Sequence, residues 1–342
     1  MKENDPEVKL HMLLAGDVGG TKTLIGLFDQ LPVRPRAISV RSYVTLEHPS
    51  LEAILDSFFK EEALTTPVKC ACFGVAGPVA DHSATLTNVP WRVNGKALAR
   101  HHHIGKVAVL NDLTSMAYGI LLLEESEIHV LQEGTPRPNG NMALIAAGTG
   151  LGECMLHFVD GDFHPTSSES GHADFAARSE LDIAVLRRLT SRQGRASVED
   201  VLSGRGIVHL HAVSHEGPCP ALPDPDVPNA AATITAAALE RRCHGCVSAL
   251  AAFVSAYGAE AGNLALRTMA TGGVFVGGGI APKILPAMTD GTFVDAFRRK
   301  SPFEALLERI PVKVILNENL GLLGAASYAA RLFAGRGDGV SG

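Results

Sequence analysis

The apolar residues of this chain fall into strand-like runs and helix-spaced stretches that follow one another in a definite order. Apolar residues lead into a glycine-rich turn at 16–23 and a second β-branched run leaves it, which predicts strand, tight turn, strand over 13–28. Alternation predicts a third strand, and helical spacing after Ser50 predicts a helix with that serine as its N-cap. The elements expected next are a strand at 37–46, a helix at 50–62, a strand at 68–75, a polar irregular stretch at 81–95, a helix at 96–102, a strand at 107–110 and a helix from 113 onward.

A second cycle of the same kind begins near residue 142. Residues 142–152 again form a strand that enters a glycine-threonine turn, and 153–159 are again strand-like. The stretch 273–280 repeats the strand-to-glycine step of 72–77. The other elements expected are helices at 180–188, 198–202 and as a pair across 230–269, a proline-rich surface loop at 215–228, a last strand at 312–316 and a last helix at 320–333.

Length and composition fit a two-domain α/β enzyme. The chain has 342 residues, of which 46% are hydrophobic, 19% are charged and 35 are glycines. A net charge of -6 provides no basic patch for a nucleic acid or an anionic membrane, so any phosphate site must be local. We expect a small domain over 1–111 and 318–335, a large domain over 112–317 and a disordered tail over 336–342.

The cysteines and the amino terminus predict a soluble cytoplasmic protein. Of the six cysteines only Cys243 and Cys246 have the spacing of a metal or redox pair, and no second such pair completes a zinc site. We therefore interpret them as incidental thiols. The first residues are charged and lack the apolar segment of a signal peptide, and no apolar run reaches the roughly 18 residues of a membrane span.

The first glycine turn has the residues of a phosphate-binding loop. Glycines let the main chain approach an anion closely, and the hydroxyls of Thr21 and Thr23 add donors. A carboxylate at Asp17 would repel phosphates unless hydrated Mg²⁺ stands between them, so we expect Asp17 to bind Mg²⁺ through water. The nucleotide-binding candidates of this turn are Gly16, Asp17, Gly19, Gly20, Thr21 and Lys22.

Two other interpretations of this turn are open. A glycine turn between apolar strands is often only a hairpin. A P-loop is the second alternative, but the pattern fails at Thr21, where a P-loop has glycine. It also fails after Thr23, where a β-branched run replaces the helix that a P-loop opens.

Six motifs in order resemble those of bacterial glucokinases, within the superfamily of sugar kinases, actin and heat-shock chaperone ATPases. The motifs are Gly16-Asp17-Val18-Gly19-Gly20-Thr21, Asn111-Asp112, Gly148-Thr149-Gly150-Leu151-Gly152, Glu169-Ser170-Gly171-His172, Val198-Glu199-Asp200-Val201-Leu202-Ser203-Gly204 and Gly277-Gly278-Gly279-Ile280. The resemblance covers nearly the whole chain. It implies the two-lobed actin-like ATPase fold, which is ribonuclease H-like, with a duplicated βββαβαβα core and a cleft between lobes.

Asn111 and Asp112 end one predicted strand and open a helix, at the edge where α/β sheets place ligand-binding groups. An aspartate at such a junction is also a routine helix cap. The resemblance implies that Asp112 accepts the proton of the sugar hydroxyl as it attacks the γ-phosphate, and that Asn111 binds the sugar. A carboxylate within hydrogen-bond reach supplies the orientation and the proton acceptor that this reaction needs.

The resemblance also implies further sugar contacts at Glu169, His172, Glu199 and Asn88. The Glu-x-x-His spacing of Glu169 and His172 occurs in carboxylate-bridged metal sites as well, but that use needs a helix and a second pair. A carboxylate and an imidazole suit sugar hydroxyls. Glu199 alone is equally consistent with an acidic first turn of a capped helix.

The remaining motifs complete the expected nucleotide site. By resemblance Gly148, Thr149 and Gly150 hold the phosphates from the second domain, and Gly277, Gly278 and Gly279 let the backbone pass close to the adenosine. The expected substrates are glucose and ATP with Mg²⁺, and the family implies a homodimer. Another hexose or amino-sugar kinase is the nearest alternative, and a nucleotide-gated binding protein or sugar sensor is a more distant one.

Overall fold

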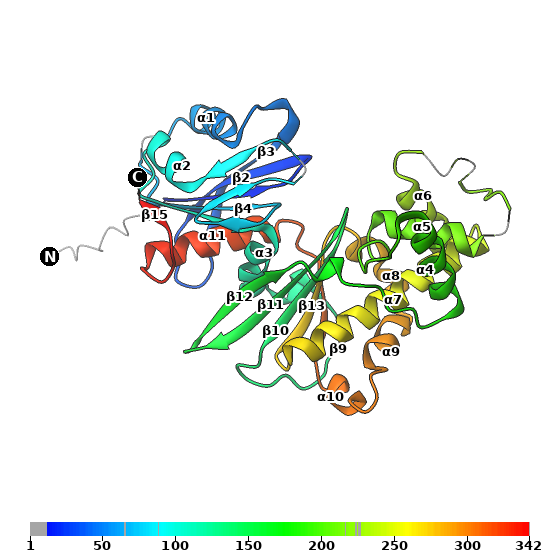
Figure 1. Cartoon of the computed structure of the whole chain (residues 1–342). Helices are drawn as coiled ribbons and strands as arrows, with labels where there is room; N and C mark the ends of the chain where they lie inside the picture. Colours follow the sequence, from blue (N-terminus) through cyan, green and yellow to red (C-terminus); the bar gives the residue numbers. More distant parts are fainter. Residues whose placement is uncertain are drawn as a thin grey trace. The chain divides into compact units, whose positions relative to one another are not determined.

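The computed structural model describes residues 12–64, 66–87, 89–215, 217–222, 224 and 227–341. It divides into two compact units (Figure 1). Unit 1 comprises Met1–Leu123 and Asn319–Gly342, and unit 2 comprises Glu124–Glu318. The chain thus leaves unit 1 once, completes unit 2 and returns.

Unit 1 is built on a mixed six-stranded sheet with the order β15-β8-β4-β1-β2-β3. The first three strands form an antiparallel meander, and β4 and β8 follow in parallel to β1. Its strands are β1 (Met12–Val18), β2 (Lys22–Asp29), β3 (Arg36–Val44), β4 (Cys70–Val75), β8 (Lys106–Asn111) and β15 (Val340–Ser341). A separate small sheet holds β5 (Val79–Ala80), β6 (Ser83–Thr85) and β7 (Arg92–Asn94).

Helices cover both faces of the unit 1 sheet, as Figure 1 shows. The alternation along β1 sends Leu14 into one core with α1 (Leu51–Glu62) and α2 (Gly95–His101), and Leu13 into the other with α3 (Asp112–Ile120) and α11 (Leu320–Phe333). A 3₁₀ turn, η1 (Thr45–Glu47), follows β3. The helix predicted after Ser50 is confirmed, with the Ser50 hydroxyl accepting from the Ala53 amide.

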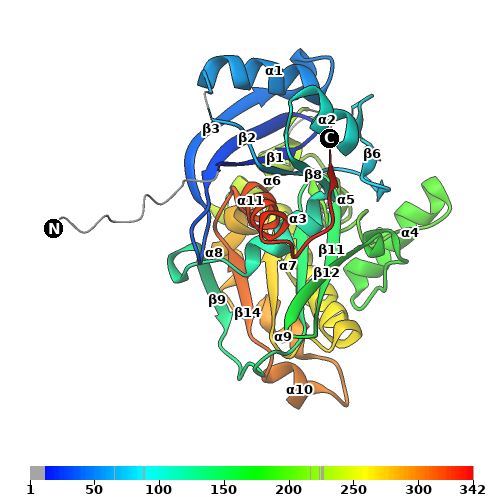
Figure 2. The ribbon, with the colours of Figure 1, turned by 90° about the vertical axis from the view of Figure 1, so that its left-hand side faces the viewer.

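Unit 2 repeats this design. Its sheet has the order β12-β11-β10-β13-β14-β9, again an antiparallel meander, two parallel strands and an antiparallel edge strand. The strands are β9 (Ile128–Gln132), β10 (Met142–Ala147), β11 (Leu151–Val159), β12 (Asp162–Ser168), β13 (Gly273–Gly277) and β14 (Val312–Ile315). Figure 2 shows β11 and β12 side by side. The predicted duplicated α/β core is confirmed.

The helices of unit 2 fill the two long connections of its sheet. The central one is α7 (His244–Thr268), whose buried face packs on β10, α5 and α9 in one continuous core. The others are α4 (Glu180–Gln193), α5 (Gly204–Ser214), α6 (Ala230–Leu239), α8 (Leu285–Met288), α9 (Thr292–Arg298) and α10 (Glu304–Glu308), with 3₁₀ turns η2 (Glu125–Glu127), η3 (Ser170–His172) and η4 (Ala281–Ile284).

The structure differs from the sequence-based expectations at several places. The domain boundary falls twelve positions later, because α3 packs on α11 and belongs to unit 1. Residues 198–202 form a turn rather than a helix, since the Asp200 carboxylate binds the Ser197 amide and hydroxyl and closes the segment locally. Part of the expected disordered tail forms β15, which pairs with β8. The stretch expected to be irregular before α2 holds the small three-stranded sheet.

Within the described ranges, none of the helices combines the length and the apolar character that crossing a membrane would need.

Candidate functional site

The predicted unit 1 residues gather at one edge of its sheet. Register aligns Val18 with Val75, and Val75 with Asn111, so three parallel strands end side by side. The glycine turn follows the first of these ends, and Asp112 follows the third. Carboxyl ends of parallel strands are where such sheets bind ligands.

The glycine turn is braced by Thr45, a residue that sequence reasoning missed. The Gly19 amide donates to the Lys22 carbonyl at 3.1 Å, and the Thr45 hydroxyl donates to the Gly19 carbonyl at 2.9 Å. The expectation that Thr23 donates to phosphate is wrong, because its hydroxyl is fully buried and hydrogen-bonded to that of Thr45. Thr21 and Lys22 are exposed at the tip.

Asp17 carries the largest electrostatic perturbation at this edge. Burial, and then the charge of Asp112, raise the pKa of Asp17 to about 6, against a lowering contribution from Lys22. A Cβ at Gly321 would lie 2.6 Å from Asp17 Oδ2, so this helix position must be glycine to admit the carboxylate. Sequence reasoning missed Gly321 because α11 comes some 300 residues later in the chain.

Asn111 caps α3 and leaves Asp112 in its first turn. The Asn111 Oδ1 accepts from the amides of Leu113 and Thr114 at 3.0 and 3.3 Å, while Nδ2 donates to the Gly77 carbonyl. Asp112 Oδ1 accepts from the Leu113 amide at 2.9 Å. The cap function is therefore real and falls on Asn111, and the half-buried Asp112 carboxylate is held in place beside it.

One predicted residue of unit 1, Gly16, does not join this edge. Gly16 lies buried within β1, where a Cβ would meet the Phe73 ring at 2.5 Å, so the structure gives it a packing role. Asn88 lies outside the described residues.

In unit 2, the second glycine turn and Glu199 form one assembly. Glu199 Oε2 accepts from the Leu151 amide at 2.9 Å, and its Oε1 accepts from Arg205 at 3.2 Å. A Cβ at Gly150 would lie 2.5 Å from Glu199 Oε2. The Gly204 amide donates to the Gly148 carbonyl at 2.9 Å, which ties the start of α5 to the same turn. Thr149 is exposed at its tip.

Glu169 precedes the 3₁₀ turn η3, and His172 is its last residue; this turn packs against the same assembly. A Cβ at Gly171 would lie 2.3 Å from the Leu151 carbonyl oxygen, and the Gly171 carbonyl accepts from the Glu199 amide at 2.8 Å. The side chains of Glu169 and His172 are exposed. Three motifs that are distant in the sequence thus meet at one place in unit 2.

The third glycine motif lies at the neighbouring strand end. Gly278 has a φ of +82°, and a Cβ there would lie 2.2 Å from the Ala147 carbonyl oxygen. The buried Tyr257 hydroxyl accepts from the Ala147 amide at 3.1 Å and donates to the Gly277 carbonyl at 3.2 Å. Sequence reasoning missed Tyr257, which joins the ends of β10 and β13. Gly279 has open space around its Cβ position.

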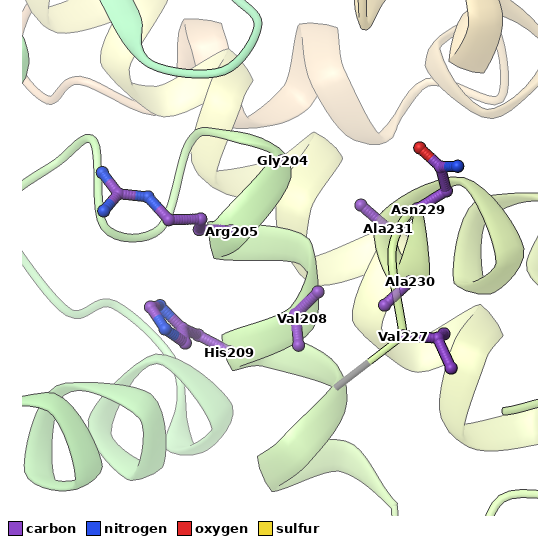
Figure 3. A pocket seen from close by; sticks show the side chains of 8 residues that line it. All are labelled: Gly204, Arg205, Val208, His209, Val227, Asn229, Ala230 and Ala231. Atoms are coloured by element: carbon purple, nitrogen blue, oxygen red, sulfur yellow. The ribbon is translucent and has the colours of Figure 1, made fainter. Parts of the chain in front are cut away.

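A pocket of about 280 Å³ lies between α5 and the start of α6 (Figure 3). Figure 3 shows Val208 on the side of α5 that faces Val227 and Ala230, whereas the side chains of Arg205 and His209 extend the other way. No predicted site residue in the described ranges lines this pocket. Its apolar centre does not suit a sugar or a phosphate.

The repeated strand order with a glycine turn at each sheet edge defines a protein of the actin-like ATPase fold. The model of the family described as Glucokinase matches residues 14–332. The glucokinase of Nostoc punctiforme is 38% identical over 343 residues, covering 94% of this chain and 100% of that protein. That of Synechocystis is 37% identical, covering 93% and 98%. A crystal structure of glucokinase from an Antarctic psychrotroph has a TM-score of 0.83 at 27% identity, covering 94% of this chain and 99% of that one. The chain belongs to the glucokinase family.

Proposed function

We propose that this chain transfers the γ-phosphoryl group of ATP to the 6-hydroxyl of glucose, with Asp112 as the general base. Family membership supports the reaction. The observation that carries the residue assignment is that the first glycine turn and Asp112 follow the aligned ends of β1 and β8, which lie on either side of β4 in one sheet. A phosphate cradle and a carboxylate base at the same edge are what phosphoryl transfer to a hydroxyl needs.

The residues of unit 1 activate the acceptor and bind phosphate. Asp112 would accept the proton of the attacking hydroxyl and orient its oxygen. Its backbone is fixed by the Asn111 cap, which limits the reorganisation that the base needs during the reaction. The amide of Gly20 and the exposed side chains of Thr21 and Lys22 would contact the phosphates, in a turn that the Gly19 amide closes on the Lys22 carbonyl.

A magnesium ion fits this edge of unit 1. Burial, and then the charge of Asp112, raise the pKa of Asp17, and a divalent cation near Asp17 would stabilise its charged form against both. We propose that Asp17 holds hydrated Mg²⁺. The ion would neutralise charge on the ATP phosphates.

The residues of unit 2 bind the sugar and the nucleotide. The exposed Glu169 and His172 side chains would accept from and donate to glucose hydroxyls. Gly148, Thr149 and Gly150 would hold phosphates, and Gly277, Gly278 and Gly279 would lie along the adenosine. Glu199 differs from the others because both of its carboxylate oxygens already bind protein groups. We propose that a sugar hydroxyl reaches it as a further partner.

Asp112→Asn tests the assignment of the base. Because the amide is isosteric but cannot accept the proton, we expect kcat to fall by about 10²–10⁴-fold with little change in glucose affinity. ADP release should be measured over a panel of hexoses and amino sugars, with the product identified by mass and position. Asp56→Asn, at an exposed carboxylate of α1, is the matched control and should retain full activity.

ADP release by the wild type without any sugar would contradict the kinase proposal. Faster ADP release with another sugar than with glucose would support the kinase reaction but contradict glucose as the substrate. Cytoplasmic location and a homodimer stay predictions, and light scattering of the purified chain checks the second.

A further inference from the structure

Three thiols that the proposed reaction does not use meet in unit 2. Cys219 lies in the loop after α5, Cys243 is the N-cap residue of α7, and Cys246 lies in the first turn of that helix. All three are at least nine-tenths buried, and all three are free thiols. Cys219 Sγ lies 3.6 Å from Cys243 Sγ and 3.8 Å from Cys246 Sγ.

These separations match a shared metal rather than a covalent bond. A disulfide holds its sulfurs about 2.0 Å apart. Ligands about 2.3 Å from a tetrahedral zinc ion lie roughly 3.8 Å from each other. The two distances from Cys219 agree with the second arrangement, and all three sulfurs lie within 4.8 Å of one another, close enough to share one ion.

His215 stands beside this cluster, with a ring nitrogen within 4.8 Å of Cys219 Sγ. Its side chain lies within hydrogen-bonding reach of Cys243, and its ring is held by a hydrogen bond from Nδ1 to the Gly217 carbonyl at 2.9 Å. A backbone carbonyl that accepts from one ring nitrogen leaves the other as the metal-binding atom, which is the usual arrangement around zinc-bound histidine.

The backbone of the Cys243–Cys246 segment is shaped to admit that ring. A Cβ at Gly245 would lie 2.4 Å from His215 Cδ2, so any other residue there would displace the imidazole. The amide of Cys246 donates to Cys243 Sγ, and the N-terminus of a 25-residue helix adds partial positive charge at the same sulfur.

A second histidine lies next to the cluster. The His211 side chain is 6% exposed, and its Nε2 has no hydrogen-bond partner among the described residues. Its ring centroid lies 5.3 Å from that of His215, and its nearest ligand atom lies within 4.8 Å of Cys219 Sγ. His211 is thus a second imidazole beside the same sulfur, and variants of the two histidines distinguish which one binds the metal.

We propose that Cys219, Cys243, Cys246 and His215 bind one structural zinc ion. Three thiolates and an imidazole in tetrahedral array favour zinc among the common divalent metals. Four protein ligands leave no open coordination position, so the ion is structural and takes no part in phosphoryl transfer. The zinc ion joins the part of the loop that holds Cys219 to the end of α5 and to the start of α7.

The interpretation of the Cys243 and Cys246 pair as incidental thiols missed this arrangement for a clear reason. The other two ligands precede the pair by more than twenty residues, on the far side of α6. A single cysteine in a loop has no spacing pattern to detect. Only the packing of α5 and α6 on α7 brings it to the pair.

Metal analysis of the full-length chain tests the proposal. Protein purified under reducing conditions in zinc-supplemented medium should contain about one zinc per chain after exhaustive dialysis. Replacement by Co²⁺ should give the intense visible absorption of a tetrahedral site together with sulfur-to-cobalt charge-transfer bands. Zinc-free protein with three thiols that all react in the native state would overturn the proposal, and so would a disulfide that forms in reducing buffer.

Matched variants separate the ligands from their neighbours. Cys219→Ser and Cys243→Ser should lower the zinc content at least about tenfold, and His215→Ala should weaken zinc binding more than His211→Ala does. His244→Ala, an exposed residue inside the pair, and Cys154→Ala, a buried thiol of β11, should retain one zinc. Loss of zinc in His211→Ala but not in His215→Ala would overturn the assignment of the fourth ligand. The cobalt spectrum of the wild type decides the question of sulfur ligation even where a variant fails to fold.

Discussion

At the scale of single residues, Gly150 and Glu199 act as a pair. The resemblance assigns the glycine to phosphate and the glutamate to sugar, yet the carboxylate rests against the glycine and holds the next amide of the turn. The turn that we propose holds phosphate in unit 2 and the carboxylate that we propose binds sugar are therefore positioned by the same contact. A change at either residue should alter the binding of both substrates.

Gly150→Ala tests this coupling. The added Cβ forces Glu199 Oε2 off the Leu151 amide, so we expect kcat/KM for glucose to fall by about 100-fold and the KM for ATP to rise. Steady-state kinetics with each substrate varied in turn measures both effects. Gly204→Ala is the control, because a Cβ there meets only the Gly148 carbonyl at 3.7 Å, and its kinetics should match the wild type. Unchanged kinetics in Gly150→Ala would contradict the coupling.

The residues of the candidate site were predicted unequally well from the sequence. Glycine turns and a strand-to-helix Asn-Asp step leave local patterns, and the structure places these at sheet edges. Thr45, Tyr257 and Gly321 leave none, because each acts on a turn that is remote from it in the chain. Their importance follows from tertiary packing alone.

At the scale of elements, α7 joins the two strand ends of unit 2 that carry glycine turns through one hydroxyl. Tyr257 is fully buried, and its hydroxyl bonds β10 and β13 at the points where their glycine turns begin. Burial raises the pKa of this tyrosine, so the hydroxyl stays protonated across the physiological range.

Tyr257→Phe should destabilise unit 2 by about 1–3 kcal/mol, since it leaves the Ala147 amide buried without a partner. Hydrogen exchange measured peptide by peptide should show faster exchange at the ends of β10 and β13. Tyr43→Phe removes an exposed hydroxyl that bonds Glu61, and its stability should change by less than about 0.5 kcal/mol. Equal losses of stability in the two variants would show that the buried hydroxyl of Tyr257 does not stabilise unit 2.

The periodicities predicted the central strands and the long helices and missed the edge strands β9 and β12. The strands of the unit 1 meander, together with β10, β11, α1, α7 and α11, have patterns of apolar residues that stand out. The edge strands β9 and β12 have mostly half-buried or exposed side chains, and β12 contains a proline and two serines, which are typical of loops. Their strand geometry comes from pairing with β14 and β11.

At the scale of the whole molecule, one buried carboxylate makes stability depend on pH. Glu153 is fully buried, neither of its oxygens has a hydrogen-bond partner among the described residues, and Arg267 is 3.8 Å away. Burial, and then the charge of Glu260, raise the pKa of Glu153 from an ordinary 4.5 to about 7, which Arg267 only partly offsets.

Because the folded chain keeps this proton after the unfolded chain has lost it, the free energy of unfolding should fall as pH rises from about 4.5 to about 7. Above about pH 7 the ionisation of Glu153 lowers the free energy of unfolding no further, and the total decrease is at most about 3 kcal/mol. Glu153→Gln should remove this part of the decline. Denaturant titrations of the wild type and of Glu153→Gln at about pH 5 and pH 8 measure the free energy of unfolding. Hydrogen exchange at amides of unit 2 assigns the change to this unit. A decline that is as steep in the variant would contradict the assignment.

The insertion of unit 2 into unit 1 has a consequence for synthesis on the ribosome. The two ends of unit 2 are joined by hydrogen bonds from Leu316 and Asn317 to Glu127, so all of its contacts are available once residue 318 has emerged. Unit 1 lacks α11 until residues 320–333 have been made, although that helix packs on β1, β4 and α3. Domains commonly fold in the order in which they are made. Here unit 2 is the first that can be completed, and the earlier part of unit 1 waits as a sheet with only α3 on the face that α11 later covers.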